Sequence, residues 1–196
     1  IADPKHRRKV CPYIAYMPQG LGTNLSKTLS VEENLQFVGR LFGHSAAEIR
    51  KRIDDLTKST GLYEFLDRPA GKLSGGMKQR AALIRTMALK PELLLLDEPF
   101  SALDYQTRLI VSADICNLIR KSGKTVILIT HDLSEAVRLS DRIIVLTKRP
   151  ATIQKEFNIH LTMEKQTPLA AMNAPEFNDY FNLLWKELND EKTIQS

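Results

Sequence analysis

Apolar residues follow two patterns along this chain. Short runs composed mostly of apolar residues lie at 13–17, 93–96, 125–130 and 142–146. Runs of this length without polar alternation are typical of strands buried on both faces of a parallel sheet. Longer stretches between them repeat apolar residues every three or four positions, as amphipathic helices do. The alternation of strands and helices with short links predicts right-handed crossovers and an α/β fold with a mostly parallel sheet.

A block of about 40 residues, 30–69, is helical in pattern throughout. Ser30 with Glu33, and Ser45 with Glu48, both have the spacing of a capping box, in which two side chains satisfy open N–H groups of the first helical turn. Glycines can end both helices. We therefore expect a helical insert between two strand-bearing segments.

The remaining helices are predicted at about 74–89, 104–121 and 132–137, and the chain changes character after Pro150. Residues 152–159 can add an edge strand, and 162–174 are expected to be loop. Pro175 then opens a helix with an apolar stripe that needs a surface to cover. The stripe consists of Phe177, Tyr180, Phe181, Leu184 and Leu188.

Two adjacent acids, Asp97 and Glu98, directly follow the apolar run at 93–96. Open α/β sheets place their ligands at the carboxyl ends of strands. Neighbouring carboxylates at a buried edge repel each other, so they usually serve a cation or a catalytic step. The alternative is a strand that runs into a solvated acidic turn.

The helix expected from residue 74 begins with Ser74, Gly75 and Gly76. A helical amino terminus without bulky side chains exposes N–H groups that suit an anion such as phosphate. Taken alone, the segment is better explained as a loop with a serine N-cap.

His131 ends the strand at 125–130 as Asp97 and Glu98 end theirs. These three side chains can therefore converge on one edge of the sheet. A lone histidine is often a structural hydrogen-bonding residue, and both interpretations stay open.

Composition narrows the class of protein. The 43% hydrophobic and 26% charged residues are those of a globular protein, and no apolar run is long enough to cross a bilayer. Cys11 and Cys116 are far apart in sequence, which argues against a disulfide framework or a zinc site. Residues 151–196 carry −3, so residues 1–150 carry +8. The basic run at 5–9 has no interleaved aromatic residues, so we expect a solvated basic face or attraction to phosphates, and no specific DNA binding.

Taken together, the motifs resemble the nucleotide-binding domain of ATP-binding cassette (ABC) ATPases, in the family's order across residues 13–149. Gln19 falls at the Q-loop, 73–77 at the signature, 93–98 at Walker B, 101–104 at the D-loop, and His131 at the switch histidine. The resemblance implies a P-loop NTPase-like fold: a mostly parallel sheet flanked by helices, with an inserted α-helical subdomain.

The same resemblance implies one nucleotide-binding domain over 1–196, truncated at its N-terminus. Its expected parts are a helical subdomain with the signature helix at 30–89, a catalytic α/β core at 90–150, and a C-terminal extension with an amphipathic helix at 151–196.

By resemblance, each motif residue has a role in hydrolysing ATP with Mg²⁺. Asp97 holds the metal, Glu98 orients or deprotonates the attacking water, and His131 contacts the γ-phosphate. Gln19 senses metal and water. Ser74, Gly75, Gly76 and Asp104 bind nucleotide across a head-to-tail dimer of two nucleotide-binding domains. The implied partners are integral membrane permease subunits, at the cytoplasmic face of the cell membrane.

The sequence departs from the family in one motif. It contains no G-x-x-x-x-G-K-[ST], and Gly123-Lys124-Thr125 is no substitute because Leu118 stands where the first glycine belongs and a strand follows. In the family this phosphate loop precedes the Q-loop, so it would fall before Ile1. These 196 residues alone are expected to bind ATP weakly and not to hydrolyse it.

The two halves also resemble different branches. Residues 1–79 are similar to ribosome-associated and export-type ABC ATPases, and residues 80–196 to ATPase subunits of nitrate, sulfonate and taurine importers. A natural mosaic, an assembly artefact and a constructed chimera all fit this pattern. The leading hypothesis is an importer ATPase; the alternatives are a ribosome-associated or export-type ATPase, and an inactive fragment without its phosphate loop.

Overall fold

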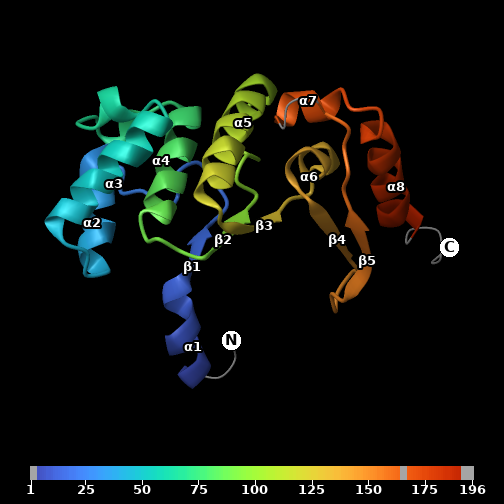
Figure 1. Ribbon diagram of the computed structural model, residues 1–196, viewed down its shortest axis with the longest axis horizontal. Helices are drawn as coiled ribbons and strands as arrows, with labels where there is room; N and C mark the ends of the chain where they lie inside the picture. The colour runs from blue at the N-terminus through green and yellow to red at the C-terminus, as the bar shows by residue number, and fades with distance from the viewer. Residues whose placement is uncertain (1–3, 164–166, 191–196) are drawn as a thin grey trace. The chain divides into compact units, whose positions relative to one another are not determined.

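A computed structural model describes residues 4–163 and 167–190 of the chain. The chain divides into two compact units, and the boundary falls between Ile129 and Thr130. Each unit has its own sheet and its own helices (Figure 1).

The first unit is built on a three-stranded parallel sheet. Its strands are β1 (Ile14–Met17), β2 (Leu93–Asp97) and β3 (Thr125–Ile129), in the order β1-β2-β3, so that β2 is central. Parallel pairing requires crossovers, and the intervening helices provide them. The prediction of an α/β fold with a parallel sheet and flanking helices is confirmed.

Burial alternates along β2, whereas the sequence predicts a strand that is buried on both faces. Leu94 and Leu96 are buried, whereas Leu93 and Leu95 are half-buried. Leu95 pairs with Ile127, which is 48% exposed, so one face of the sheet is only partly covered. The expectation of burial on both faces is therefore wrong for this face.

The helical block lies between β1 and β2, as predicted. It contains α2 (Val31–Leu41), α3 (Ala46–Ser59), the short 3₁₀ helices η2 (Tyr63–Phe65) and η3 (Ala70–Lys72), and α4 (Gly75–Met87). In Figure 1, α2 lies beside α3 and α4, and buried side chains from all three form one apolar cluster. The other helices of this unit are α1 (Pro4–Val10), η1 (Cys11–Tyr13) and α5 (Tyr105–Ser122).

Both predicted capping boxes are present. The Glu33 N–H donates to Ser30 Oγ over 3.1 Å, and the Ser30 N–H donates to Glu33 Oε2 over 2.7 Å. Ser45 and Glu48 make the same reciprocal pair at the start of α3. Two side chains thus satisfy open donors at each helix start, which fixes where each helix begins.

The second unit packs helices on a two-stranded antiparallel sheet. Its strands are β4 (Arg142–Leu146) and β5 (Ile153–Asn158), and its helices are α6 (Leu133–Leu139), α7 (Pro168–Met172) and α8 (Phe177–Asp190). Phe177 and Leu184 of α8 are buried with Val137 and Val145, whereas Leu188 is 44% exposed. The predicted stripe therefore covers this unit's own core over its first two turns.

One stretch of this unit was predicted wrongly. The expected loop at 162–174 contains α7, which Thr167 caps by accepting the Ala170 N–H at 3.2 Å. A five-residue helix is too short to leave a periodic signal in the sequence. Within residues 4–163 and 167–190, no helix combines the length and apolar character needed to cross a membrane.

Candidate functional site

Asp97 and Glu98 lie at the carboxyl end of the central strand. Asp97 is the last residue of β2 and pairs in register with Ile129 at the end of β3. The Glu98 N–H donates to the Ile129 carbonyl over 2.8 Å, which extends the ladder by one bond. Neighbouring strands thus hold the acidic pair at the edge where α/β sheets bind ligands.

Tyr16 of β1 contacts Asp97 across the sheet. Its side chain lies on the same face because Tyr16 pairs with Leu95, two residues before Asp97. The Tyr16 hydroxyl donates to Asp97 Oδ2 over 2.8 Å, and this hydrogen bond to a carboxylate raises the pKa of Tyr16. Tyr16 thereby fixes the orientation of the Asp97 carboxylate.

Glu98 has a left-handed backbone, with φ at +45°. Side chains other than glycine and asparagine rarely adopt this conformation, and such strain persists where the surroundings enforce it. Ser101 reinforces the turn, because its N–H and its hydroxyl both donate to the Glu98 carbonyl, over 3.3 and 3.0 Å. The backbone thus turns sharply at the second acid.

Gln19 lies in the loop that follows β1, and its side chain is exposed. Its carbonyl accepts from the Thr23 hydroxyl over 3.1 Å, which closes the loop locally. Because β1 is parallel to β2, Gln19 and Asp97 both follow the carboxyl ends of adjacent strands.

The signature segment begins α4. Ser74 is its N-cap, and its Oγ accepts from the Met77 N–H over 3.3 Å. Gly75 and Gly76 follow without side chains, as an anion site at a helix terminus requires. They also allow close packing: a Cβ on Gly76 would lie 3.0 Å from Val111. Both the anion interpretation and the N-cap interpretation fit this geometry.

Asp104 is the N-cap of α5. Its Oδ1 accepts from the Thr107 N–H over 3.0 Å, and this bond is the main cause that lowers the pKa of Asp104. A carboxylate with a lowered pKa stabilises the fold above its unfolded pKa, and this contribution is lost as pH falls through the folded pKa.

Replacing Asp104 by asparagine should therefore make the melting temperature depend less on pH in the acid range. Asparagine keeps the capping acceptor but does not titrate. We expect the melting temperature of Asp104→Asn to fall less than that of the wild type below about pH 4. Circular dichroism melting between pH 2.5 and pH 6 measures this. Asp55→Asn, an exposed site on α3, is the matched control and should follow the wild type.

His131 is exposed and lies at the start of the second unit, two residues after β3 ends. Asp132 next to it caps α6 by accepting the Glu135 N–H over 3.0 Å. The convergence of His131 with Asp97 and Glu98 stays a prediction, because these residues belong to different units.

The acidic pair suits a metal ion whose ligands come partly from the protein and partly from a substrate. Among the described residues, no group of three or more His, Cys, Asp and Glu side chains could enclose a metal ion. Mg²⁺ often binds through one or two carboxylates together with water and substrate phosphates. Asp97 fits that role because the Tyr16 hydroxyl bonds to only one of its two carboxylate oxygens, so the other can bind a metal.

Two side chains near the site were not identified from the sequence. The sequence marks Tyr16 only as part of an apolar run, because its contact with Asp97 depends on how β1 pairs with β2. The sequence marks Gln79 only as the end of the signature segment. It is buried on α4 and bonds to the loops after β1 and β2.

Comparison with known protein families gives a match that covers about half of the chain. The profile of the family described as "ABC transporter" matches residues 2–101. That range includes Gln19, the signature segment and both acids at the end of β2.

Individual relatives are similar over most of the chain. The uncharacterized ABC transporter ATP-binding protein YtlC of Bacillus subtilis is 39% identical over 82% of this chain and 62% of its own length. A taurine import ATP-binding protein, TauB of Jannaschia sp., is 41% identical over 69% of this chain and 50% of its own. The nitrate import ATP-binding protein NrtD of Synechocystis sp. is 36% identical over 86% and 65%. The chain thus spans about half to two thirds of these relatives.

A solved structure supports the fold. The chain is similar to CbiO1 from Clostridium perfringens, described as part of the ABC transporter complex CbiONQ, with a TM-score of 0.70 and 26% identity. The match covers 81% of this chain and 62% of CbiO1.

Proposed function

The chain belongs to the ABC transporter family, and from this premise we propose that it is an ATP-binding, ATP-hydrolysing subunit that couples hydrolysis to transport across a membrane. The observation that carries the proposal is the placement of Asp97 and Glu98 at the carboxyl end of β2, between β1 and β3. Attack of water on a γ-phosphate needs charge neutralisation and a positioned nucleophile, and adjacent carboxylates can supply both.

The proposed roles divide the chemistry among few residues. Asp97 would hold Mg²⁺, which would neutralise charge on the phosphates, and Glu98 would accept a proton from the attacking water. Gln19 contacts metal and water from the neighbouring loop. His131 would contact the γ-phosphate.

The signature segment acts on a second nucleotide-binding domain. Ser74, Gly75 and Gly76 present a hydroxyl and N–H groups to the nucleotide held by the partner, and Asp104 lies at the same interface. Each chain therefore contributes half of each site in a head-to-tail dimer.

The transported substrate is proposed from the relatives. The names of TauB and NrtD refer to taurine and nitrate import. An importer of the nitrate, sulfonate and taurine type is therefore favoured, with the chain at the cytoplasmic face of the membrane beside its permease subunits.

ATP turnover in two forms of the chain tests the enzymatic role. Residues 1–196 contain no G-x-x-x-x-G-K-[ST] segment, so they should bind Mg²⁺-ATP weakly and release no phosphate above background. The same residues with such a strand–loop–helix segment placed ahead of Ile1 should hydrolyse ATP. Turnover by the 196 residues alone, or none in the extended chain with its permease, would contradict the proposal.

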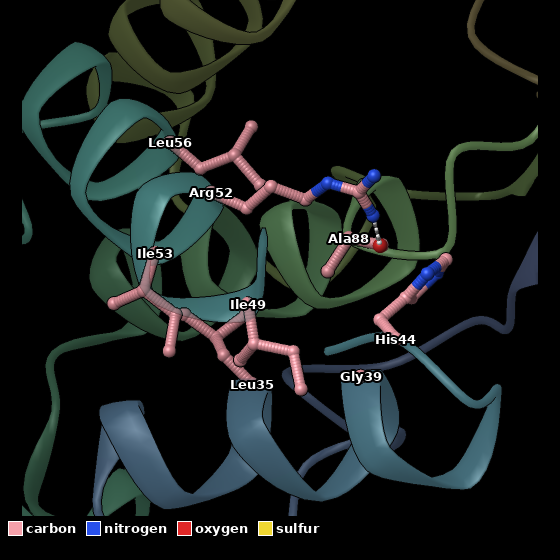
Figure 2. A pocket seen from close by; sticks show the side chains of 8 residues that line it. All are labelled: Leu35, Gly39, His44, Ile49, Arg52, Ile53, Leu56 and Ala88. Carbon is pink, nitrogen blue, oxygen red and sulfur yellow. Dashed lines mark hydrogen bonds between the residues drawn. The ribbon is translucent and has the colours of Figure 1, made fainter. Parts of the chain in front are cut away.

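A small pocket in the helical block has a volume of about 10 Å³, which is room for a single water molecule. It lies between α2, α3 and the end of α4, where Arg52 crosses to the Ala88 carbonyl (Figure 2). Arg52 Nη1 donates to that carbonyl over 2.6 Å, and burial lowers the pKa of Arg52. Among the described residues, Arg52 Nη2 and His44 Nε2 are buried without a hydrogen-bond partner. A water molecule held in the pocket would supply a hydrogen-bond partner for such atoms.

Replacing Arg52 should therefore destabilise the helical block. We expect Arg52→Met to lower the free energy of unfolding by about 1.5–3 kcal/mol, since the charged hydrogen bond to the Ala88 carbonyl is lost. Arg50→Met is the matched control: Arg50 is on the same helix but is half exposed and pairs with Glu32 and Asp54, so its replacement should change stability little. Equal effects of the two variants in urea unfolding would contradict this role of Arg52.

A soluble ribosome-associated ATPase is the alternative function. Its basis is the resemblance of residues 1–79 and the +8 charge of residues 1–150. Co-sedimentation with ribosomes that weakens with salt would favour it, because binding to RNA phosphates releases counterions.

A further inference from the structure

Gln79 joins two loops that are far apart in the sequence. It lies on α4, one turn after the signature glycines, and is 1% exposed. Its Oε1 accepts from the Gly22 N–H over 3.1 Å, and its Nε2 donates to the Pro99 carbonyl. Both ends of one buried amide are thus bonded to backbone, each to a different loop.

The two loops carry the residues proposed for the reacting water and metal. Gly22 lies three residues after Gln19, and Pro99 directly follows Glu98. The Gln79 side chain therefore connects a point close to Gln19 with the Pro99 carbonyl, one residue after the acidic pair. A buried amide cannot replace these bonds with water, so their loss leaves backbone groups unsatisfied.

Packing around the start of α4 supports the same connection. A Cβ on Gly22, whose φ is +61°, would lie 3.3 Å from Lys78 Cβ, next to Gln79. A Cβ on Gly75 would lie 3.3 Å from Leu103 Cδ2 and 3.7 Å from the methyl groups of Leu21. The first turns of α4 thus lie against both loops.

We propose that Gln79 is a positioning residue that holds the loop after β1 and the loop after β2 at a fixed spacing, so that a displacement of one moves the other. This coupling stands on the hydrogen bonds alone. Its consequence for catalysis, a fixed spacing of Gln19 and Glu98, rests on the proposed function.

A second side chain provides a matched control. Thr86, also on α4 and 3% exposed, accepts from Asn24 Nδ2 over 3.1 Å. It therefore ties α4 to the loop after β1 but bonds to no residue of 98–104 among the described hydrogen bonds. Removing its hydroxyl should loosen one loop, whereas removing the Gln79 amide should loosen both.

Hydrogen exchange by mass spectrometry on the 196-residue chain, without nucleotide, separates these outcomes. In Gln79→Met we expect amides in 20–25 and in 100–104 to exchange about tenfold faster, because each loop loses a buried hydrogen bond. In Thr86→Val only 20–27 should change. A merely structural role for Gln79 would instead raise exchange throughout the first unit in proportion to a lower melting temperature. That result, or a change confined to one loop, would overturn the proposal.

If Gln79→Met shows no cooperative unfolding transition, the variant has not folded, and the wild-type chain is measured instead. Its Gln79 side-chain amide protons should exchange about tenfold slower than those of Gln106, which is exposed. Equal rates would overturn the proposal. Neither measurement needs ATP, so failure here is distinguishable from failure of the proposed ATPase function.

Discussion

Glu98→Gln should abolish turnover while nucleotide stays bound. In a chain that carries a phosphate-loop segment ahead of Ile1, we expect kcat to fall about 10²–10⁴-fold, the usual contribution of a general base. Glutamine has the same size and can occupy the turn at residue 98, but it cannot accept the proton of the attacking water. Phosphate release and equilibrium binding of Mg²⁺-ATP measure the two effects separately.

Glu92→Gln is the matched control for that experiment. Glu92 directly precedes β2, at the opposite end of the strand from Glu98, and is exposed. It should leave kcat unchanged. An unchanged kcat in Glu98→Gln would contradict the assignment of the base, and loss of ATP binding together with turnover would indicate a binding role instead.

Helix starts were predictable from the sequence because they depend on contacts three residues apart. Ser30 with Glu33 and Ser45 with Glu48 needed no tertiary information, and both capping boxes are present. The parallel pairing of β1, β2 and β3 was likewise predictable, since helices separate the strands.

Contacts between distant segments were not predictable in the same way. Tyr16 and Asp97 are 81 residues apart, and their hydrogen bond depends on the register of β1 against β2. In the sequence Gln79 is one of several polar residues of a predicted helix, and only the buried residues on the same helix face indicate that it is buried. Gly76, Leu83 and Thr86 share its helix face and are all buried, so a glutamine there needed partners.

Part of the candidate site remains a prediction. Asp97, Glu98, Gln19 and the signature segment all belong to the first unit, whereas His131 begins the second. The structure places the acidic pair at the end of β2, whereas the chemistry of the pair and the role of His131 both stay proposals.

The strand that presents the acidic pair should also dominate stability. Leu94 is fully buried in β2, and Leu94→Ala should lower the free energy of unfolding by about 2–5 kcal/mol, through lost burial and the cavity it leaves. Urea unfolding at constant m-value measures this. A loss of that size is a large share of a domain's usual stability of about 5–15 kcal/mol.

Leu41→Ala on α2 is the matched control for Leu94→Ala, because Leu41 is 68% exposed and should change stability by less than about 0.5 kcal/mol. Equal effects of the two changes would show that β2 is not packed in solution as described. A wild-type chain without a cooperative transition would favour the alternative of an incompletely folded fragment. We expect a cooperative unfolding transition whose midpoint shifts in Leu94→Ala and stays in place in Leu41→Ala. That result would show that the sheet positioning Asp97 and Glu98 is part of a folded core.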